Sequence, residues 1–375
     1  MKVGILTFPN SISHGAALQM FALYQTCLDL GYDTEIINYH NLWMKQLKHV
    51  TVGQGRGNVL LWGKRKINDL LHICMKARFA QFEKQMQKYP RRAVSAPELL
   101  PLLAKRYGAV ICGSDQVWNP DITGEDLSYF LDFCNKETAR ISYAPSFGVE
   151  TLTEEYAQNV RRELEVFDYL SIREEAGQVL IRDLTGLDAK LVVDPTFLLD
   201  AAMWQKFEQF HPQAEGAYIL YYTVRSSKTL WKHCLALAKK TNMKILRIGS
   251  NVISKHLKKM EGVEDICDIG PGQWLYLMRH ASYVVTNSFH GMAFSINYEK
   301  NFYVEFSSAT NSRLSNIVKL LGLEDRVIRE DTDLTASAVD YSQSSVVLSQ
   351  MKAESLAFLT DALQSAQIKQ GITNE

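Results

Sequence analysis

The sequence lacks the paired cysteines of disulfide frameworks and of metal sites. Its six cysteines, among 375 residues, form neither a CxxC pair nor a Cys/His cluster with zinc spacing. They stand at residues 27, 74, 112, 134, 234 and 267. This distribution is typical of buried free thiols in a reducing compartment. We therefore expect neither a metal centre nor a disulfide.

Long apolar runs are also missing. No stretch reaches the roughly 18 uninterrupted apolar residues that a membrane-spanning helix requires. The opening "MKVGILTF" passes from one lysine into a short β-rich run, which is too short for a secretory signal or an anchor. These absences predict a cytoplasmic protein.

The whole chain carries no excess of charge, with 41 basic and 41 acidic residues. This balance excludes a molecule-wide field that would attract nucleic acid, so we expect no nucleic-acid partner. Residues 45–92, the basic stretch, depart from it with twelve Lys or Arg against two acids. The stretch is either a solvated helix on a bundle or lid, or a peripheral contact for anionic lipid head groups or a pyrophosphate-linked substrate.

The length exceeds the range in which one hydrophobic core usually keeps growing, so two domains are expected. Short β-type runs alternate with helical patterns, which predicts α/β domains with mostly parallel, doubly wound sheets. The alternation restarts after Pro195. We place the domains at 1–200, with the basic stretch as a helical insert, and at 201–345. A last helix within 346–375 is expected to pack back on the first domain.

Several polar stretches follow β-type runs, at the positions where doubly wound sheets bind ligands. Loops and helix N-termini there offer unpaired N–H groups and a partial positive charge. The stretches are "SISHGAALQ" (11–19), "GSDQVWNP" (113–120), "SIREE" (171–175), "TVRS" (223–226) and "TNSFHG" (286–291). Each has an ordinary structural alternative: helix capping for the first, an Asx turn for the second, and surface ion pairs for Arg173 and Arg225.

His290 stands where the apolar run "SYVVT" ends and a helix-like segment begins. Ser288 can cap that segment, and Gly291 leaves room beside it. At the positive end of the helix, His290 would face an anionic ligand and could carry a proton. A structural histidine is the alternative.

From residue 1 to about 330, the sequence resembles the polysaccharide pyruvyl transferases. The resemblance rests on the order and spacing of "SHGAALQMFAL", "GSDQVWNP", "SYAPSFG", "SIREE", "VVDPTFLL", "TNSFHGMAFSI" and "NSRLSNIVKLLGLEDR". It implies two Rossmann-like domains in a glycosyltransferase-B-like arrangement, with the active site in the cleft. It also implies phosphoenolpyruvate as donor, a ketal formed on two sugar hydroxyls, release of phosphate, and no cofactor.

The resemblance also suggests roles for individual residues. His290 would supply or relay a proton to the donor, and Asp115 would accept one from the acceptor hydroxyl. The expected donor-binding residues are Arg173, Arg225, Ser288, Gly291 and Arg313. The expected acceptor-binding residues are Ser13, His14, Gly15, Gln116 and Asn119.

Two positions depart from the family pattern. Ser288 stands where many members carry an arginine, so the charge for the phosphate must come from elsewhere, with Arg225 and Arg313 as candidates. Asn287 stands where relatives often have aspartate. Two other functions stay open: a nucleotide-sugar glycosyltransferase of similar architecture, and a non-catalytic carbohydrate-binding member of a polysaccharide assembly complex. The acceptor sugar itself is either soluble or lipid-linked.

Overall fold

The computed structural model describes residues 1–9, 11–41, 43, 73–86, 93–249, 260–306, 311–330, 332, 334 and 337–371, without the side chains of 311–315. The chain divides into two compact units. The first comprises Met1–Arg56, Glu83–Leu198 and Ser349–Glu375, and the second comprises Gly57–Phe82 and Leu199–Leu348. The main change of unit thus falls between Leu198 and Leu199, and we expected it near residue 200.

The first unit is built on a four-stranded parallel sheet in the order β2-β1-β3-β4. Its strands are β1 (Lys2–Leu6), β2 (Asp33–Ile36), β3 (Ala109–Cys112) and β4 (Ala139–Ser142). A separate parallel pair consists of β5 (Ser171–Ile172) and β6 (Lys190–Leu191). The central strand β3 is buried throughout, because a parallel sheet covered on both faces has no solvent side.

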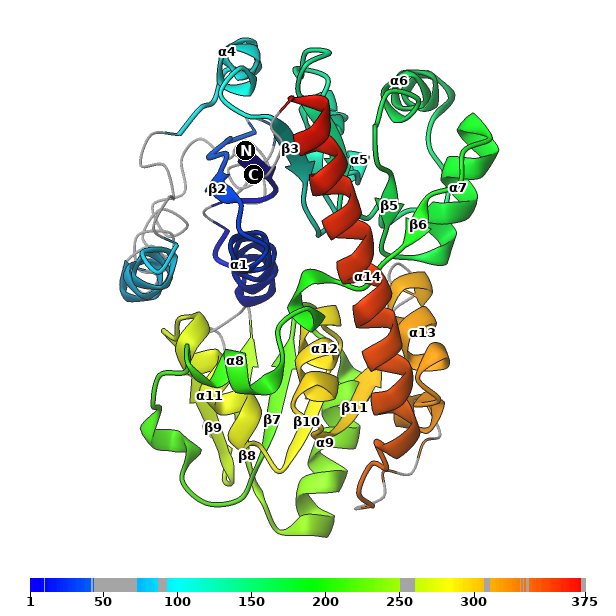
Figure 1. The fold of residues 1–375 in the computed structure, drawn as a ribbon. Coiled ribbons are helices and arrows are strands. Elements are labelled where there is room, and N and C mark those ends of the chain that lie inside the picture. The colour runs from blue at the N-terminus through cyan, green and yellow to red at the C-terminus, as the bar shows by residue number, and fades with distance from the viewer. Residues whose placement is uncertain are drawn as a thin grey trace, which may run out of the picture. The chain divides into compact units, whose positions relative to one another are not determined.

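Helices connect these strands and cover the sheet of the first unit (Figure 1). They are α1 (His14–Asp29), α4 (Leu100–Ala104), α5 (Pro120–Thr123), α6 (Glu154–Leu164) and α7 (Glu175–Thr185). The C-terminal helix α14 (Ser342–Lys369) belongs to this unit from Ser349 on. There Glu354 pairs with Lys190 at 3.1 Å, and Ser355 Oγ accepts a hydrogen bond from Val193 N at 3.0 Å.

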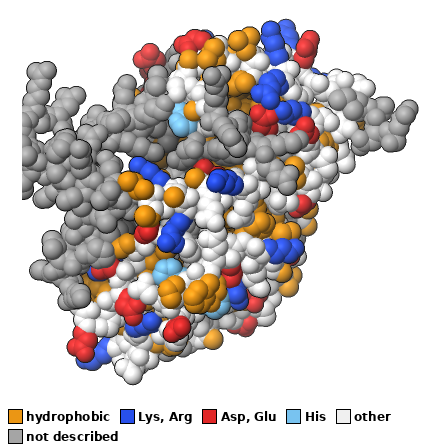
Figure 2. All heavy atoms as spheres, turned by 90° about the vertical axis from the view of Figure 1, so that its left-hand side faces the viewer, with side chains coloured by type: hydrophobic (Ala, Val, Ile, Leu, Met, Phe, Trp, Pro, Cys, Tyr) orange, Lys and Arg blue, Asp and Glu red, His pale blue; other side chains and the backbone are white. Residues whose placement is uncertain are grey.

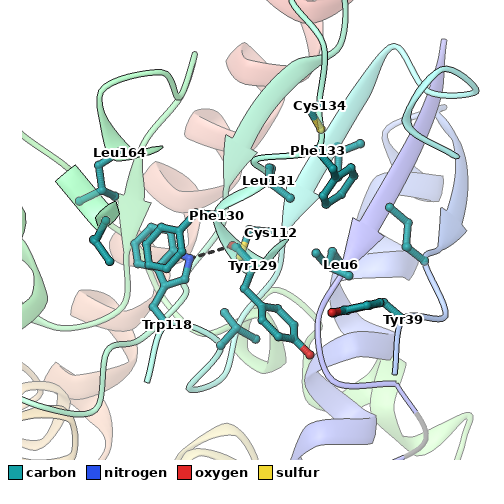
Figure 3. Packing of buried hydrophobic residues seen from close by; sticks show 14 of the residues in the cluster. Leu6, Tyr39, Cys112, Trp118, Tyr129, Phe130, Leu131, Phe133, Cys134 and Leu164 are labelled. Atoms are coloured by element: carbon teal, nitrogen blue, oxygen red, sulfur yellow. Dashed lines mark hydrogen bonds between the residues drawn. The ribbon is translucent and has the colours of Figure 1, made fainter. Parts of the chain in front are cut away.

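Aromatic side chains form much of the core next to the loop that follows β3 (Figure 3). Trp118 is fully buried, stacks on Phe130 with ring centroids 4.8 Å apart, and donates its indole N–H to Tyr129 O at 2.9 Å. Phe147, from the loop after β4, packs on the same indole at 5.2 Å. Because Trp118 belongs to "GSDQVWNP", this packing fixes the loop that carries Asp115.

The second unit is built on a six-stranded parallel sheet in the order β12-β11-β10-β7-β8-β9. The strands are β7 (Tyr218–Thr223), β8 (Lys244–Gly249), β9 (Val263–Ile266), β10 (Tyr283–Thr286), β11 (Asn301–Glu305) and β12 (Val327–Ile328). The chain builds outward from β7 in one direction and then, from β10, in the other. The carboxyl ends of β7 and β10 therefore meet at a topological switch point, where open α/β sheets bind ligands.

Helices cover both faces of this second sheet (Figure 1). They are α8 (Ala201–Gln205), α9 (Lys228–Thr241), α11 (Pro271–His280), α12 (Phe289–Asn297) and α13 (Asn311–Leu320). The ring of Tyr222 packs against Trp274 of α11, whereas the ring of Tyr221 packs against Trp231 of α9. Successive strand residues point to opposite faces, so α9 covers one face and α11 covers the other.

Most of the basic stretch lies outside the described residues. Within 45–92, the structure describes only residues 73–86. We expected this insert in the first domain, but residues 73–82 pack with the second unit. Among their contacts there, Arg78 ion-pairs with Asp268 at 3.8 Å and lies against Gly270. On the face that Figure 2 shows, described Lys and Arg side chains are interspersed with Asp and Glu.

Candidate active site

The turn from β10 into α12 is fixed by two side chains at the switch point, Thr286 and Ser288. Thr286 Oγ1 donates to Tyr222 O at 2.6 Å and accepts from Ser288 N at 3.0 Å. Ser288 is the N-cap of α12, and its Oγ accepts from Gly291 N at 3.3 Å. The predicted capping role of Ser288 is therefore confirmed. These bonds determine where the first turn of α12 begins.

Gly291 allows α12 to lie close to the strands. A Cβ at this position would stand 2.4 Å from Thr286 Oγ1 and 3.0 Å from the ring of Tyr222. Any larger residue would push the helix away from β7 and β10. The room that the sequence predicts beside Gly291 is thus filled by the sheet itself.

His290 is the second residue of α12 and is half-buried. Its ring lies edge-on to that of Phe289, with centroids 5.3 Å apart. The helix dipole gives this end of α12 a partial positive charge. This position suits a group that exchanges a proton with a bound anion.

Asn287 joins this turn to the loop that follows β7. Its Oδ1 accepts from Val224 N at 3.0 Å, and its Nδ2 donates to Arg225 O at 2.8 Å. The side chain is nearly buried. Only an amide can both accept and donate here, because an ionised carboxylate is an acceptor alone. Asn287 therefore joins the α12 turn to the loop after β7 through both atoms of its amide.

Arg225 lies on this loop with an exposed side chain. Within the part of the chain that the structure describes, it makes no ion pair. Its guanidinium can therefore serve an anion near the α12 turn. Arg313 belongs to α13, but its side chain lies outside the description.

The loop after β3 in the first unit has an unusual backbone. Asp115 has a φ of 87° although it is not a glycine, and it forms a bridge with Pro145. Its Oδ1 accepts from Gln116 N at 2.8 Å. Gln116 in turn accepts from Asn119 Nδ2 at 2.8 Å. A non-glycine residue with positive φ is strained, and such strain is concentrated at functional sites.

The start of α1 lies in the same unit as this loop. Ser13 caps α1, with Ala16 N 3.5 Å from its Oγ, and His14 and Gly15 are the first, buried residues of the helix. Gln19 donates to Thr7 Oγ1 at 3.0 Å, and Thr7 Oγ1 donates to Ser114 O at 2.8 Å. This chain of bonds ties α1 and the end of β1 to the residue before Asp115.

Comparison with known proteins decides the family. A family model for polysaccharide pyruvyl transferases matches residues 14–304. The chain belongs to this family. A search of curated proteins found no match.

Solved structures are similar to this family member in fold. One from Listeria monocytogenes, assigned as a UDP-N-acetylglucosamine 2-epimerase, is 10% identical, with a TM-score of 0.54 over 99% of this chain and 90% of that one. S. aureus MnaA with UDP is 10% identical, with a TM-score of 0.50 over 94% of this chain and 96% of that one. The heptosyltransferase WaaC of E. coli, with ADP, is 11% identical, with a TM-score of 0.41 over 84% of this chain and 90% of that one. The first two confirm the predicted fold class, α/β with Rossmann-like units of parallel sheet.

Among the described residues of this pyruvyl transferase family member, no helix is both long enough and apolar enough to cross a bilayer. Nor do they bring together three or more His, Cys, Asp or Glu side chains in a group that could hold a metal ion.

Arg173, expected as a donor ligand from its place in the family pattern, lies inside the first unit. Its Nη1 donates to Asp194 Oδ2 at 2.6 Å, and the two side chains are 3% and 0% exposed. Ser114 Oγ donates to the same carboxylate at 2.8 Å. Burial acts to lower the pKa of Arg173, but Asp194, Glu174 and Asp115 raise it above its ordinary value. Arg173 thus forms an ion pair, which was the structural alternative for this residue, but the pair is buried rather than at the surface.

The sequence analysis assigned no role to Asp194. It also did not predict that the Asn287 side chain forms hydrogen bonds to the loop after β7. Asp194 directly follows the apolar run "LVV" (191–193), and a polar residue after an apolar run is the same signal that marked the other strand ends. For Asn287 the sequence analysis considered only that a carboxylate is absent at this position. Its bonds to Val224 and Arg225 depend on β7 and β10 being neighbours, which the sequence does not state.

Proposed function

We propose that this family member transfers the pyruvyl group of phosphoenolpyruvate onto two hydroxyls of a sugar as a ketal, with release of phosphate, in surface polysaccharide biosynthesis. The observation that supports it most is the α12 turn, where His290 follows the Ser288 cap. Through Asn287, this turn is bonded to the loop that carries Arg225. A proton-carrying group thus lies next to groups that bind anions, and phosphoenolpyruvate requires both.

The proposed reaction begins with a proton added to the methylene carbon of phosphoenolpyruvate. This leaves an oxocarbenium-like centre on the neighbouring carbon, to which one sugar hydroxyl adds. The bond from that carbon to the phosphate oxygen then breaks, and the second hydroxyl closes the ketal. One hydroxyl proton restores the proton donated at the start, and the other leaves with the phosphate. We assign the donated proton to His290.

The donor carries a phosphate and a carboxylate. We assign their binding to the first turn of α12, with Ser288 and Gly291, and to Arg225, because helix N-termini and guanidinium groups both bind such anions. Arg313 is a further candidate for the same charge.

For the acceptor we propose the first unit. Asp115 is the candidate base for a hydroxyl, and its strained backbone is held by the packing of Trp118. The nearby polar groups proposed to bind the sugar are Ser13, His14, Gly15, Gln116 and Asn119. Gln116 and Asn119 also bond to each other, so a sugar would meet a pair of amides with a defined orientation.

A donor screen tests the proposal. The purified protein is incubated with a pool of acceptor oligosaccharides and either phosphoenolpyruvate or a nucleotide sugar. The proposal predicts acceptor-dependent phosphate release from phosphoenolpyruvate and a pyruvylated product in the mass spectrum. His290→Ala is the control that should lose both signals.

Two results would reject the proposal. Release of nucleoside diphosphate from the nucleotide sugar, with none of phosphate from phosphoenolpyruvate, would identify a glycosyltransferase. Saturable sugar binding without turnover of either donor would identify a carbohydrate-binding member of an assembly complex.

A further inference from the structure

The second unit contains a pocket that the proposed reaction does not use. Its volume is about 320 Å³, and it is lined mainly by Tyr221, Thr223, Ser226, Lys228, Trp231 and Arg247. It lies on the α9 face of the sheet, because Tyr221 packs against Trp231. The α12 turn lies on the face of Tyr222. The pocket is therefore a separate space at the same carboxyl edge of the sheet.

Arg247 is a rigid cation in the wall of this pocket. Asp265 accepts from its Nε at 2.6 Å and from its Nη2 at 2.7 Å. Its guanidinium lies 5.0 Å from the centre of the Trp231 ring. None of the hydrogen bonds in the described residues uses Nη1 of Arg247. The group is thus held in place by Asp265 and keeps donor capacity for a ligand.

A second cation, Lys228, is the exposed first residue of α9, and the first turn of this helix contains no acid. The carboxylate of Glu305 accepts a hydrogen bond from Ser227 Oγ at 2.7 Å. Ser227 Oγ also caps α9 by accepting from Leu230 N at 3.0 Å. Ser227 is therefore a structural group, and Lys228 with Ser226 provides the polar end of the pocket.

The pocket also has an aromatic part, which is formed by Trp231 and Tyr221. Trp231 is half-buried and Tyr221 is 3% exposed. A volume of about 320 Å³ lies at the lower end of the range for small-molecule sites, about 300–1,000 Å³, and exceeds what a lone phosphate would fill. A ligand that contacts both the cations and the aromatic rings would combine an anionic group with a flat or ring-shaped body.

We propose that this pocket binds a phosphate ester of a ring compound, with the phosphate at Lys228 and Arg247 and the ring against Trp231. Two sources share this chemistry, a sugar phosphate and a nucleoside phosphate. The inference does not depend on the proposed reaction, since it concerns binding and can be measured without turnover.

Isothermal titration calorimetry of the full chain tests it with glucose 1-phosphate, UDP, inorganic phosphate, glucose and uridine. One or both phosphorylated ring compounds should saturate the protein, and whichever binds more tightly identifies the source. Inorganic phosphate, glucose and uridine should each bind at least tenfold more weakly. Phosphoenolpyruvate, which has no ring, should not displace the bound compound.

Variants locate the binding in the pocket. Lys228→Gln should weaken it about tenfold, as expected for the loss of one charged hydrogen bond. Trp231→Leu should weaken it by a similar factor through the loss of ring stacking. Lys232→Gln is the matched control, because Lys232 is exposed one turn further along α9 and does not line the pocket.

Three results would overturn the inference. The first is the absence of saturable binding by either phosphorylated ring compound to folded wild-type protein. The second is unchanged affinity in Lys228→Gln, a surface substitution that leaves the fold intact. The third is competitive displacement by phosphoenolpyruvate, which would assign the pocket to the donor.

Discussion

Replacing Asn287 with aspartate tests whether the amide itself, rather than the shape of the side chain, joins the two loops of the candidate site. A carboxylate can still accept from Val224 N. It cannot donate to Arg225 O, so its second oxygen would face that carbonyl oxygen as a second acceptor. Because Asn287 is only 9% exposed, water cannot readily replace the lost donor. An unsatisfied buried group costs about 1–3 kcal/mol, so the free energy of unfolding should fall by about 2 kcal/mol at neutral pH.

The loss should depend on pH. A protonated carboxyl can donate to Arg225 O, so the folded state favours the protonated form and raises the pKa of the new group above its usual value of about 3.9. A group whose pKa is raised on folding contributes its full stability below the unfolded pKa and loses it as the pH rises through the folded pKa. The difference from wild type should therefore be small near pH 4 and grow to its full size towards neutrality.

Guanidinium unfolding at steps between about pH 4 and pH 8 measures this difference. Asn301→Asp is the matched control, because Asn301 Oδ1 accepts from Val339 N at 2.9 Å and no described hydrogen bond uses its Nδ2. The control should stay close to wild type throughout. Wild-type stability of Asn287→Asp at pH 8, or an equal loss in both variants, would refute the reasoning.

The remaining predictions concern three side chains and the basic stretch. His290→Ala should lower turnover about 10²-fold or more with little change in the thermal midpoint, and unchanged turnover would return His290 to a structural role. Arg173→Met removes the cation beside Asp194, so chemical denaturation should show a loss of about 3–5 kcal/mol. A stable variant with a raised Michaelis constant for phosphoenolpyruvate would instead place Arg173 on the donor. Burial raises the pKa of Glu83 to about 7. The stability that protonated Glu83 contributes to the fold is therefore lost as the pH rises from about 4.3 through 7. Glu83→Gln does not ionise, so its thermal midpoint should rise relative to that of wild type across this pH range. A difference that is the same at every pH would contradict this. Through the basic stretch, the protein should cosediment with anionic rather than neutral liposomes at low salt. The bound fraction should fall when residues 64–66 are changed to Gln. Equal binding to both liposome types would identify a solvated face.

The sequence was sufficient where local rules decide the structure. The alternation of β-type runs and helical patterns predicted two α/β units, because apolar periodicity is a local property of the chain. The start of α12 was equally predictable, since Ser288 is a preferred N-cap residue directly after an apolar strand. Both predictions depend on residues that lie close together in the sequence.

The partners of strand-end residues were not predictable, because they depend on strand order. Asn287 bonds to Val224 and Arg225 only because β10 lies beside β7, with 59 residues between the two strands. The pair of Arg173 and Asp194 likewise requires β5 and β6 to be neighbours. A single sequence shows that a strand ends in an arginine, but not which carboxylate lies next to it.

The strained backbone conformations were also not predictable from the sequence. Asp115 and Ala144 both have positive φ, 87° and 54°, in the loops that follow β3 and β4. Residue preferences would place glycine at such positions. The structure maintains these conformations through packing and through the bridge between Asp115 and Pro145, which are tertiary effects that override local preference.

Asn287 and Ser288 determine the charge of the turn into α12. An amide and a hydroxyl are both neutral, so these two side chains add no charge beside Arg225. An aspartate at 287 would oppose Arg225 and repel a bound phosphate. With Arg173 balanced by Asp194 inside the first unit, a neutral amide at 287 leaves the positive field of Arg225 and of the first turn of α12 intact.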